Sequence, residues 1–177
     1  MQRQIAFLDE IRDALPGAVI VGDSTQAVYA GNLSYEPDAP KGWFNSATGY
    51  GTLGYALPAS IGAKLGAPHR PVVCLAGDGG LQFTLGELGS AIDAGTPIIV
   101  LVWNNRGYGE IKTYMQDRGI PPEGVDLHTP DFCMIARAYG WTAERLEERD
   151  SLTGLLQEAE GRAGPTLIEI DEAVIMG

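Results

Sequence analysis

Two short polar motifs follow apolar runs of this chain and could together bind a metal ion. Gly77-Asp78-Gly79-Gly80 comes directly after residues 72–76, and Trp103-Asn104-Asn105-Arg106-Gly107 comes directly after residues 98–102. Neither run alternates with polar residues, so each predicts a strand buried on both faces of a parallel sheet. Ligands of such sheets bind beyond the carboxyl ends of the strands, where Asp78, Asn105 and a carbonyl near Gly107 offer the oxygen ligands that Mg²⁺ prefers. The spacing therefore predicts a metal site that also holds a diphosphate.

The same motifs have a simpler interpretation as turns. Asp-Gly and Asn-rich dipeptides favour β-hairpins. Both motifs are followed by helical patterns rather than by a returning strand, which disfavours hairpins. Gly79 and Gly80 lack side chains where a helix begins, so their backbone amides can approach a phosphate oxygen.

Composition indicates a soluble globular protein. The chain has 177 residues, 45% hydrophobic and 20% charged, which suits one domain with a sizeable core. Its formal net charge of -11 repels nucleic acid and anionic membranes, so we expect neither as a partner. The sequence has no apolar stretch near ~18 residues and no signal peptide, which predicts a cytoplasmic location.

The pattern along the chain alternates strands and helices. Apolar runs predict strands at 18–21, 72–76, 98–102, 141–143 and 166–170, and helical spacing predicts helices at 5–15, 53–65, 84–95, 108–118, 129–140 and 151–162. Thr84 and Glu87 match a capping box at the start of the third helix. Residues 31–51 show no periodicity and predict a long functional loop. The fold class is therefore α/β, a doubly wound parallel sheet with helices on both faces.

The spacing of 27 residues from Asp78 to Asn105 resembles the cofactor motif of thiamine-diphosphate-dependent enzymes. Within that superfamily the chain resembles the branch of acetolactate synthase, benzoylformate decarboxylase and pyruvate decarboxylase. The likeness runs from Val19 to Ile170 and corresponds to their carboxyl-terminal diphosphate-binding domain, without the pyrimidine-binding and central domains. It implies thiamine diphosphate and Mg²⁺ as cofactors, with Asp78, Asn105 and the Gly107 carbonyl as metal ligands. The family often has Ser or Ala where this chain has Gly80, which leaves only the amide there.

The segment from Thr48 to Ala59 resembles the family's cofactor-bending loop. By this likeness Leu53 lies beneath the cofactor and forces it into a V shape, its amide reaches a pyrimidine nitrogen, and the Gly51 carbonyl accepts from the pyrimidine amino group. Residues 49–54 also fit the G-x-G-x-x-G nucleotide fingerprint, which leaves a nicotinamide oxidoreductase as an alternative. We disfavour it because residues 43–47 do not look like a strand.

The remaining candidate residues flank these motifs. Ser24 and Thr25 follow the first strand and are expected near the cofactor, unless they cap the next helix. In related decarboxylases, positions matching Glu110, Ile111 and Tyr114 face the substrate, although helix packing and solvation explain them equally simply. The likeness assigns cofactor contacts to Ser24, Thr25, Gly51, Leu53, Gly77, Asp78, Gly79, Gly80, Asn105, Gly107 and Tyr108.

The expected activity is decarboxylation of a 2-oxo acid. Residues 106–109 look more like the decarboxylases than the acetolactate synthases, which usually have Glu and Gln after the paired Asn. An acetolactate-synthase-type carboligase and the β-type subunit of a split enzyme stay as alternatives. A carboxylate at Glu110 would suit a cationic substrate tail, and residues 22–29 with 104–115 resemble the guanidino-oxopentanoate decarboxylases.

The resemblance also implies what this chain lacks. In the family an activating glutamate comes from the amino-terminal domain of a partner protomer, so we expect no catalytic residue here. The complete enzyme is expected to be a homodimer or homotetramer. This chain alone is predicted to be inactive.

Overall fold

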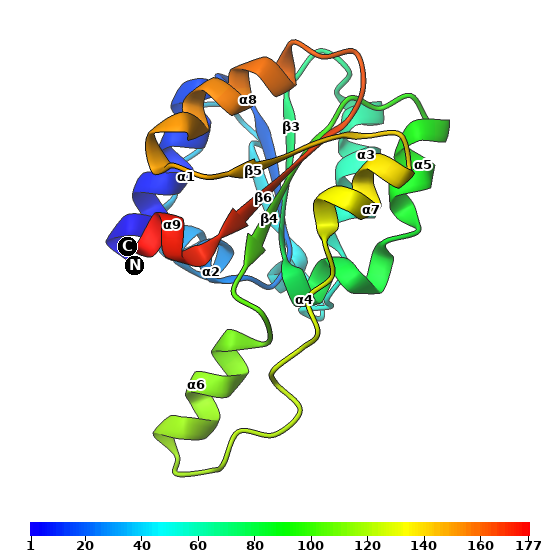
Figure 1. The fold of residues 1–177 in the computed structure, drawn as a ribbon. Coiled ribbons are helices and arrows are strands. Elements are labelled where there is room, and N and C mark those ends of the chain that lie inside the picture. The colour runs from blue at the N-terminus through cyan, green and yellow to red at the C-terminus, as the bar shows by residue number, and fades with distance from the viewer.

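The central sheet is entirely parallel. The structure, a computed structural model, describes residues 1–177 apart from the side chain of Thr48. Six strands of the described chain are hydrogen-bonded in the order β2-β1-β3-β4-β6-β5 (Figure 1). The strands are β1 (Val19–Gly22), β2 (Trp43–Asn45), β3 (Val72–Gly77), β4 (Ile99–Asn104), β5 (Thr142–Leu146) and β6 (Thr166–Asp171). The predicted fold class is confirmed.

Burial of the strands explains their unbroken apolar runs. Every residue of β1 and β3 is buried, and β4 and β6 are buried except at their last residues, Asn104 and Asp171. The edge strands β2 and β5 are only partly buried. Central strands covered on both faces are mostly apolar, and Thr166 and Glu169 of β6 are buried polar exceptions.

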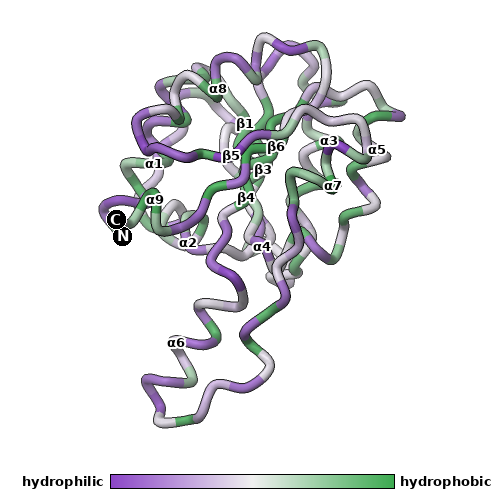
Figure 2. The backbone as a smooth tube through the Cα atoms, in the orientation of Figure 1, coloured by the Kyte–Doolittle hydropathy of each residue, from purple (hydrophilic) through white to green (hydrophobic). Residues whose placement is uncertain are grey.

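Helices cover both faces of the sheet. One core joins the sheet to α1, α2, α8 and α9, and the other joins it to α3, α4, α5 and α7. Figure 2 shows the hydrophobic colouring concentrated in the strands between these two layers. The helices are α1 (Gln2–Ala14), α2 (Gln26–Ser34), α3 (Ala56–Gly66), α4 (Asp78–Leu81), α5 (Glu87–Asp93), α6 (Gly109–Asp117), α7 (Phe132–Ala138), α8 (Leu152–Glu160) and α9 (Glu172–Met176), with short 3-10 helices η1 (Ser46–Thr48), η2 (Gln82–Thr84) and η3 (Arg149–Ser151).

Helix α6 lies outside both layers and projects from the body with the segment that returns to α7 (Figure 1). None of its described residues is buried. The returning segment contacts it through an ion pair of 2.6 Å between Lys112 Nζ and Asp126 Oδ1 and an antiparallel bridge between Gly107 and Asp126. These contacts lie near the amino-terminal end of α6, so the projecting helix is joined to the returning segment mainly there.

The long loop expected at 31–51 is wrong in part. Helix α2 runs through Ser34, and Trp43–Asn45 forms β2, which pairs with β1 through Ile20 and Trp43. The three residues of β2 are too few to show a period, and the strand exists because β1 offers it an edge. A strand therefore does precede residues 49–54, so the expectation that 43–47 form none is also wrong.

The capping box predicted at Thr84 is wrong as well. Residues 82–84 form η2, and Leu85 and Gly86 continue in the right-handed helical region before α5 begins at Glu87. A capping residue needs an extended backbone, which Thr84 does not have. Its hydroxyl is buried without a hydrogen-bond partner in the described part of the chain.

Among the described residues, no helix combines the length and the apolar character that a membrane crossing requires.

Candidate functional site

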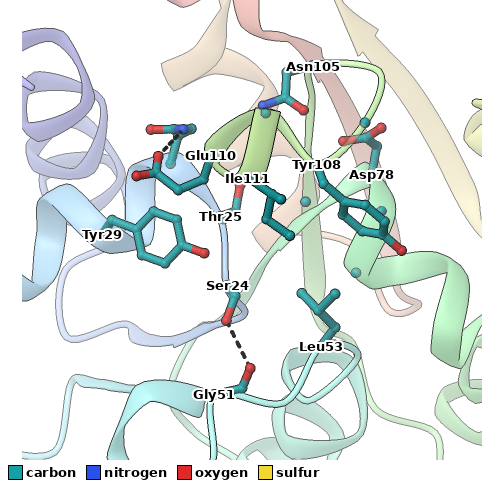
Figure 3. A pocket seen from close by; sticks show the side chains of 16 residues that line it. Ser24, Thr25, Tyr29, Gly51, Leu53, Asp78, Asn105, Tyr108, Glu110 and Ile111 are labelled. Carbon is teal, nitrogen blue, oxygen red and sulfur yellow. Dashed lines mark hydrogen bonds between the residues drawn. The ribbon is translucent and has the colours of Figure 1, made fainter. Parts of the chain in front are cut away.

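A cavity of about 290 Å³ opens at the carboxyl ends of β1, β3 and β4 (Figure 3). The strand order reverses here, because β1 is followed by β2 on one side while β3 and β4 extend the sheet on the other. Such a reversal is the usual ligand site of an open α/β sheet. The lining residues are Ser24, Thr25, Gln26, Tyr29, Gly51, Leu53, Gly77, Asp78, Gly79, Gly80, Asn105, Gly107, Tyr108, Gly109, Glu110 and Ile111. The fold thus brings together every predicted site residue except Tyr114.

The side chains of Asp78 and Asn105 and the carbonyl of Gly107 converge at this cavity. The side-chain oxygen of Asn105 lies 3.2 Å from Asp78 Oδ1 and 2.8 Å from the carbonyl oxygen of Gly107. Neighbouring oxygen ligands on an octahedral Mg²⁺ are about 2.9 Å apart, since each lies ~2.1 Å from the ion. Oxygens without a hydrogen between them repel at this distance, so a cation would stabilise the arrangement.

The carboxylate of Asp78 supports the same interpretation. Asp78 is buried, and its Oδ2 has no hydrogen-bond partner in the described chain. Burial raises the pKa of Asp78 above its usual value, although backbone N–H groups at Asn105, Gly79 and Gly107 oppose that shift. A buried carboxylate that is only partly satisfied fits a bound cation. Rotating the Asn105 amide would let its nitrogen donate to Asp78 Oδ1 and to the Gly107 carbonyl, but Asp78 Oδ2 would stay without a partner.

Backbone geometry requires glycine at position 107. Gly107 has φ of 154°, and a Cβ there would lie 2.3 Å from the carbonyl oxygen of Val125. Just beyond it, the Tyr108 amide donates to that same carbonyl at 2.9 Å. The residue before it, Arg106, has a left-handed φ of 63°. The turn after β4 is therefore tight, and it aims the Gly107 carbonyl at Asn105.

The glycines of the first motif are closely surrounded. A Cβ at Gly79 would lie 2.7 Å from the ring of Tyr108, and one at Gly80 would lie 3.3 Å from the carboxylate of Asp23. A side chain at position 80 would therefore crowd the buried carboxylate of Asp23, which would have to move by a few tenths of an ångström.

Asp23 ties the cofactor-bending loop to the end of β1. Its Oδ2 accepts from the Gly54 amide at 2.8 Å and its Oδ1 accepts from the Ser24 amide at 2.7 Å. Burial raises the pKa of Asp23, while these backbone hydrogen bonds oppose the shift. The Ser24 hydroxyl donates to the Gly51 carbonyl at 3.3 Å, and both line the cavity with Leu53 (Figure 3). Thr25 precedes α2 but makes no side-chain capping hydrogen bond.

Side chains of α2 and α6 meet at the opposite end of the cavity. Gln26 Nε2 donates to Glu110 Oε2 at 2.7 Å, and Tyr29 and Ile111 lie beside this pair (Figure 3). Tyr114 lies outside the lining, with the Arg118 guanidinium 3.4 Å from its ring centroid. Sequence reasoning missed Tyr29, although its spacing of three residues from Gln26, directly after a strand end, places both on one face of a helix.

Comparison with known proteins identifies a family. The sequence pattern described as "Thiamine pyrophosphate enzyme, C-terminal TPP binding domain" matches residues 21–170. The chain is 45% identical over 170 residues to a probable 2-ketoarginine decarboxylase of Pseudomonas aeruginosa and 31% identical over 164 residues to the acetolactate synthase large subunit of Parasynechococcus marenigrum. These alignments cover 95% and 90% of this chain.

A solved structure supports the same family assignment. The thiamine diphosphate-dependent 4-hydroxybenzoylformate decarboxylase of Rhodococcus jostii RHA1 superposes with a TM-score of 0.85 at 27% identity over 95% of this chain. The chain spans 30% and 26% of the two relatives' lengths and 32% of that structure. This chain therefore belongs to the thiamine-diphosphate-dependent enzymes of the acetolactate synthase and benzoylformate decarboxylase superfamily, of which it comprises the carboxyl-terminal cofactor-binding domain.

Proposed function

We propose that this chain holds the diphosphate of thiamine diphosphate through Mg²⁺ in a 2-oxo acid decarboxylase. The observation that carries the proposal is that the Asn105 side chain lies within hydrogen-bonding distance of both the Asp78 carboxylate, at 3.2 Å, and the Gly107 carbonyl, at 2.8 Å. The unpartnered Asp78 Oδ2 adds support. These residues would hold the ion, and phosphate oxygens would complete its coordination.

Each part of the cavity then has a role. The backbone amides of Gly79 and Gly80 would bind the diphosphate, and Leu53 and the Gly51 carbonyl would hold the rest of the cofactor. Ser24, Thr25, Gly77 and Tyr108 complete the walls. When bound, thiamine diphosphate supplies the nucleophilic carbon and the electron sink that decarboxylation needs.

Substituting the metal ligands tests this role. In the assembled enzyme with thiamine diphosphate, Mn²⁺ binding followed by electron paramagnetic resonance should be lost in Asp78→Ala and Asn105→Ala, because each variant removes one oxygen ligand. Asp93→Ala removes an exposed carboxylate of α5 and should bind Mn²⁺ as the wild type does. Unchanged Mn²⁺ affinity in both ligand variants would contradict the proposed site.

We also propose a cationic 2-oxo acid as the substrate. The relative at 45% identity is named for 2-ketoarginine, and the Glu110 carboxylate lies at the edge of the cavity. An ionised hydrogen bond to a guanidinium group contributes about 1.5–3 kcal/mol. Acetolactate synthases among the relatives keep a carboligase as the second candidate.

Neutralising Glu110 tests whether the enzyme prefers a cationic 2-oxo acid to a neutral one. Glu110→Gln should lower kcat/KM for a guanidino 2-oxo acid about 10- to 100-fold, the equivalent of that free energy, and leave a neutral 2-oxo acid nearly unaffected. Glu123→Gln, an exposed change outside the cavity lining, is the control. An unaltered preference for the cationic substrate in Glu110→Gln would remove this assignment.

The remaining domains are proposed to complete the site. They would supply the activating glutamate, within a homodimer or homotetramer, either in the same polypeptide or as a separate subunit. Membership in the family favours thiamine diphosphate over the nicotinamide alternative for residues 49–54.

A further inference from the structure

A line of polar contacts runs from the edge of the sheet to the metal loop without touching the cavity. Arg145 on β5 donates from Nε to Glu169 Oε2 on β6 at 3.0 Å, and its other nitrogen lies 2.9 Å from Asp131 Oδ2. The second oxygen of Glu169, Oε1, accepts from Asn104 Nδ2 at 2.8 Å. Glu169 is 8% exposed, so water competes little for these bonds.

Asn104 connects Glu169 to the turn that carries the proposed metal ligands. Its side-chain oxygen accepts from the Arg106 amide at 3.1 Å. Arg106 lies between Asn105 and Gly107 and has the left-handed φ of 63°. That conformation costs a residue with a Cβ about 1–2 kcal/mol, so an outside contact is needed to keep it.

We propose that Glu169 is a positioning residue for the metal site, acting through Asn104 on the backbone between the ligands Asn105 and Gly107. The inference rests on the proposed function, since it concerns the same ion. Mg²⁺ demands near-ideal octahedral geometry, whereas Ca²⁺ accepts longer and more flexible coordination. A turn whose backbone is fixed by the Glu169–Asn104 contact would therefore favour Mg²⁺, the smaller ion.

The ion pair with Arg145 orients Glu169 for this task. The hydrogen bond to Glu169 is the largest cause of the raised pKa of Arg145, so the guanidinium stays charged. Oε2 is thereby committed to Arg145, and Oε1 stays directed at Asn104. Asp131, Cys133 and Glu169 also cluster within 4.8 Å, but Arg145 binds both carboxylates, so they already have a cation.

Glu172 offers a matched control. It also accepts a hydrogen bond from β4, at 2.9 Å from Trp103 Nε1, one residue before Asn104. Both glutamates therefore contact the end of β4, but the contact of Glu169 is with the residue that holds the metal turn.

The experiment measures metal affinities of the assembled enzyme with thiamine diphosphate, using Mn²⁺ directly and Mg²⁺ and Ca²⁺ by competition. Glu169→Leu should weaken Mn²⁺ and Mg²⁺ about 10- to 100-fold, the range for partners that orient metal ligands, and weaken Ca²⁺ less. Glu169→Gln keeps an acceptor for Asn104 and should restore most of the affinity. Glu172→Leu should bind all three ions as the wild type does.

A second variant covers the case in which Glu169→Leu does not fold. Asn104→Ala leaves Glu169 paired with Arg145 and should show the same loss of Mg²⁺ relative to Ca²⁺. Where both single variants fold, their double variant should lose no more affinity than either, because both act on one path.

The outcomes separate the two proposals. A wild-type enzyme that binds no Mn²⁺ with thiamine diphosphate overturns the proposed function. Wild-type binding that survives unchanged in a folded Glu169→Leu or Asn104→Ala variant overturns the positioning role alone. Equal losses of Mg²⁺ and Ca²⁺ overturn it too, because they indicate general loosening rather than a lost geometry.

Discussion

Gly107 combines two demands that no other residue type meets. Its φ of 154° is rarely adopted by residues with a side chain, and the Val125 carbonyl occupies the space where a Cβ would lie. Because its own carbonyl is one of the three converging groups, any shift that relieves the clash also moves a proposed metal ligand.

We expect Gly107→Ala to lower the free energy of unfolding by about 2–6 kcal/mol, the sum of backbone strain and overpacking. Chemical denaturation measures the loss, and Mn²⁺ affinity should fall with it. Gly124→Ala is the control, since Gly124 also has positive φ (69°) but nothing within 4 Å of its added Cβ, and should cost about 1–2 kcal/mol. Equal losses in both variants would show that the Val125 contact is unimportant.

At the scale of elements, Asp131 begins α7 by accepting from the Met134 amide at 2.7 Å. This hydrogen bond is the largest cause of its lowered pKa, and the ion pair with Arg145 adds to it. A carboxylate whose folded pKa is depressed stabilises the fold above its unfolded pKa of about 3.8 and loses that contribution as the pH falls through the folded value.

Asp131→Asn keeps the capping oxygen and removes the charge. The variant should therefore be less stable than the wild type near neutral pH, and the gap should close as the pH is lowered below about 3.8. Urea unfolding at a series of pH values from 7 downward measures it. A gap that stays constant or widens in acid would contradict the assigned pKa direction.

Helix α6 has a different basis from the helices of the two layers. None of its described residues is buried, and the Lys112 contact with Asp126 is a partly exposed ion pair worth little by itself. Segments with few buried contacts open locally at low cost.

Backbone amides of residues 112–117 should accordingly exchange with deuterium faster than those of β4, when peptides are followed by mass spectrometry. Thiamine diphosphate with Mg²⁺ should slow exchange near Gly107 and Tyr108 in the assembled enzyme, because the turn becomes a ligand. Protection of α6 equal to that of β4 before any ligand is added would contradict the inference that α6 opens locally at low cost.

The sequence predicted the central strands of the sheet and missed the edge strand β2, which depends on its partner. Unbroken apolar runs revealed β3 and β4, since both faces of each are covered. Strand β2 has no such run, because an edge strand of three residues is defined by its pairing with β1.

The residues of the candidate site also fall into two groups: motif spacing reveals some of them, and only the structure reveals the others. Asp78, Asn105 and Gly107 could be chosen from motif spacing, since strand ends in a parallel sheet meet at one edge. Glu169 sits in an apolar run, where only its contacts with Arg145 and Asn104 reveal a role. The carbonyl of Val125 has no sequence signature at all, because any residue type would supply it.

At the scale of the whole molecule, the cavity is small. Its volume of about 290 Å³ lies at the bottom of the range of ~300–1,000 Å³ that encloses a small ligand. Tyr50, Phe83, Ile111 and Tyr114 are each more than half exposed. Ile111 lines the cavity, and the chain spans 26–32% of the compared proteins.

The isolated chain should therefore release no CO₂ from guanidino or neutral 2-oxo acids above a protein-free blank, even with thiamine diphosphate and Mg²⁺. The described cavity would hold one end of the cofactor, and the activating glutamate is expected from another domain. Circular dichroism would verify that the chain is folded, and adding the missing domains as a second polypeptide should restore turnover. CO₂ release by the chain alone, abolished by Asp78→Ala, would show instead that this domain carries a complete active site.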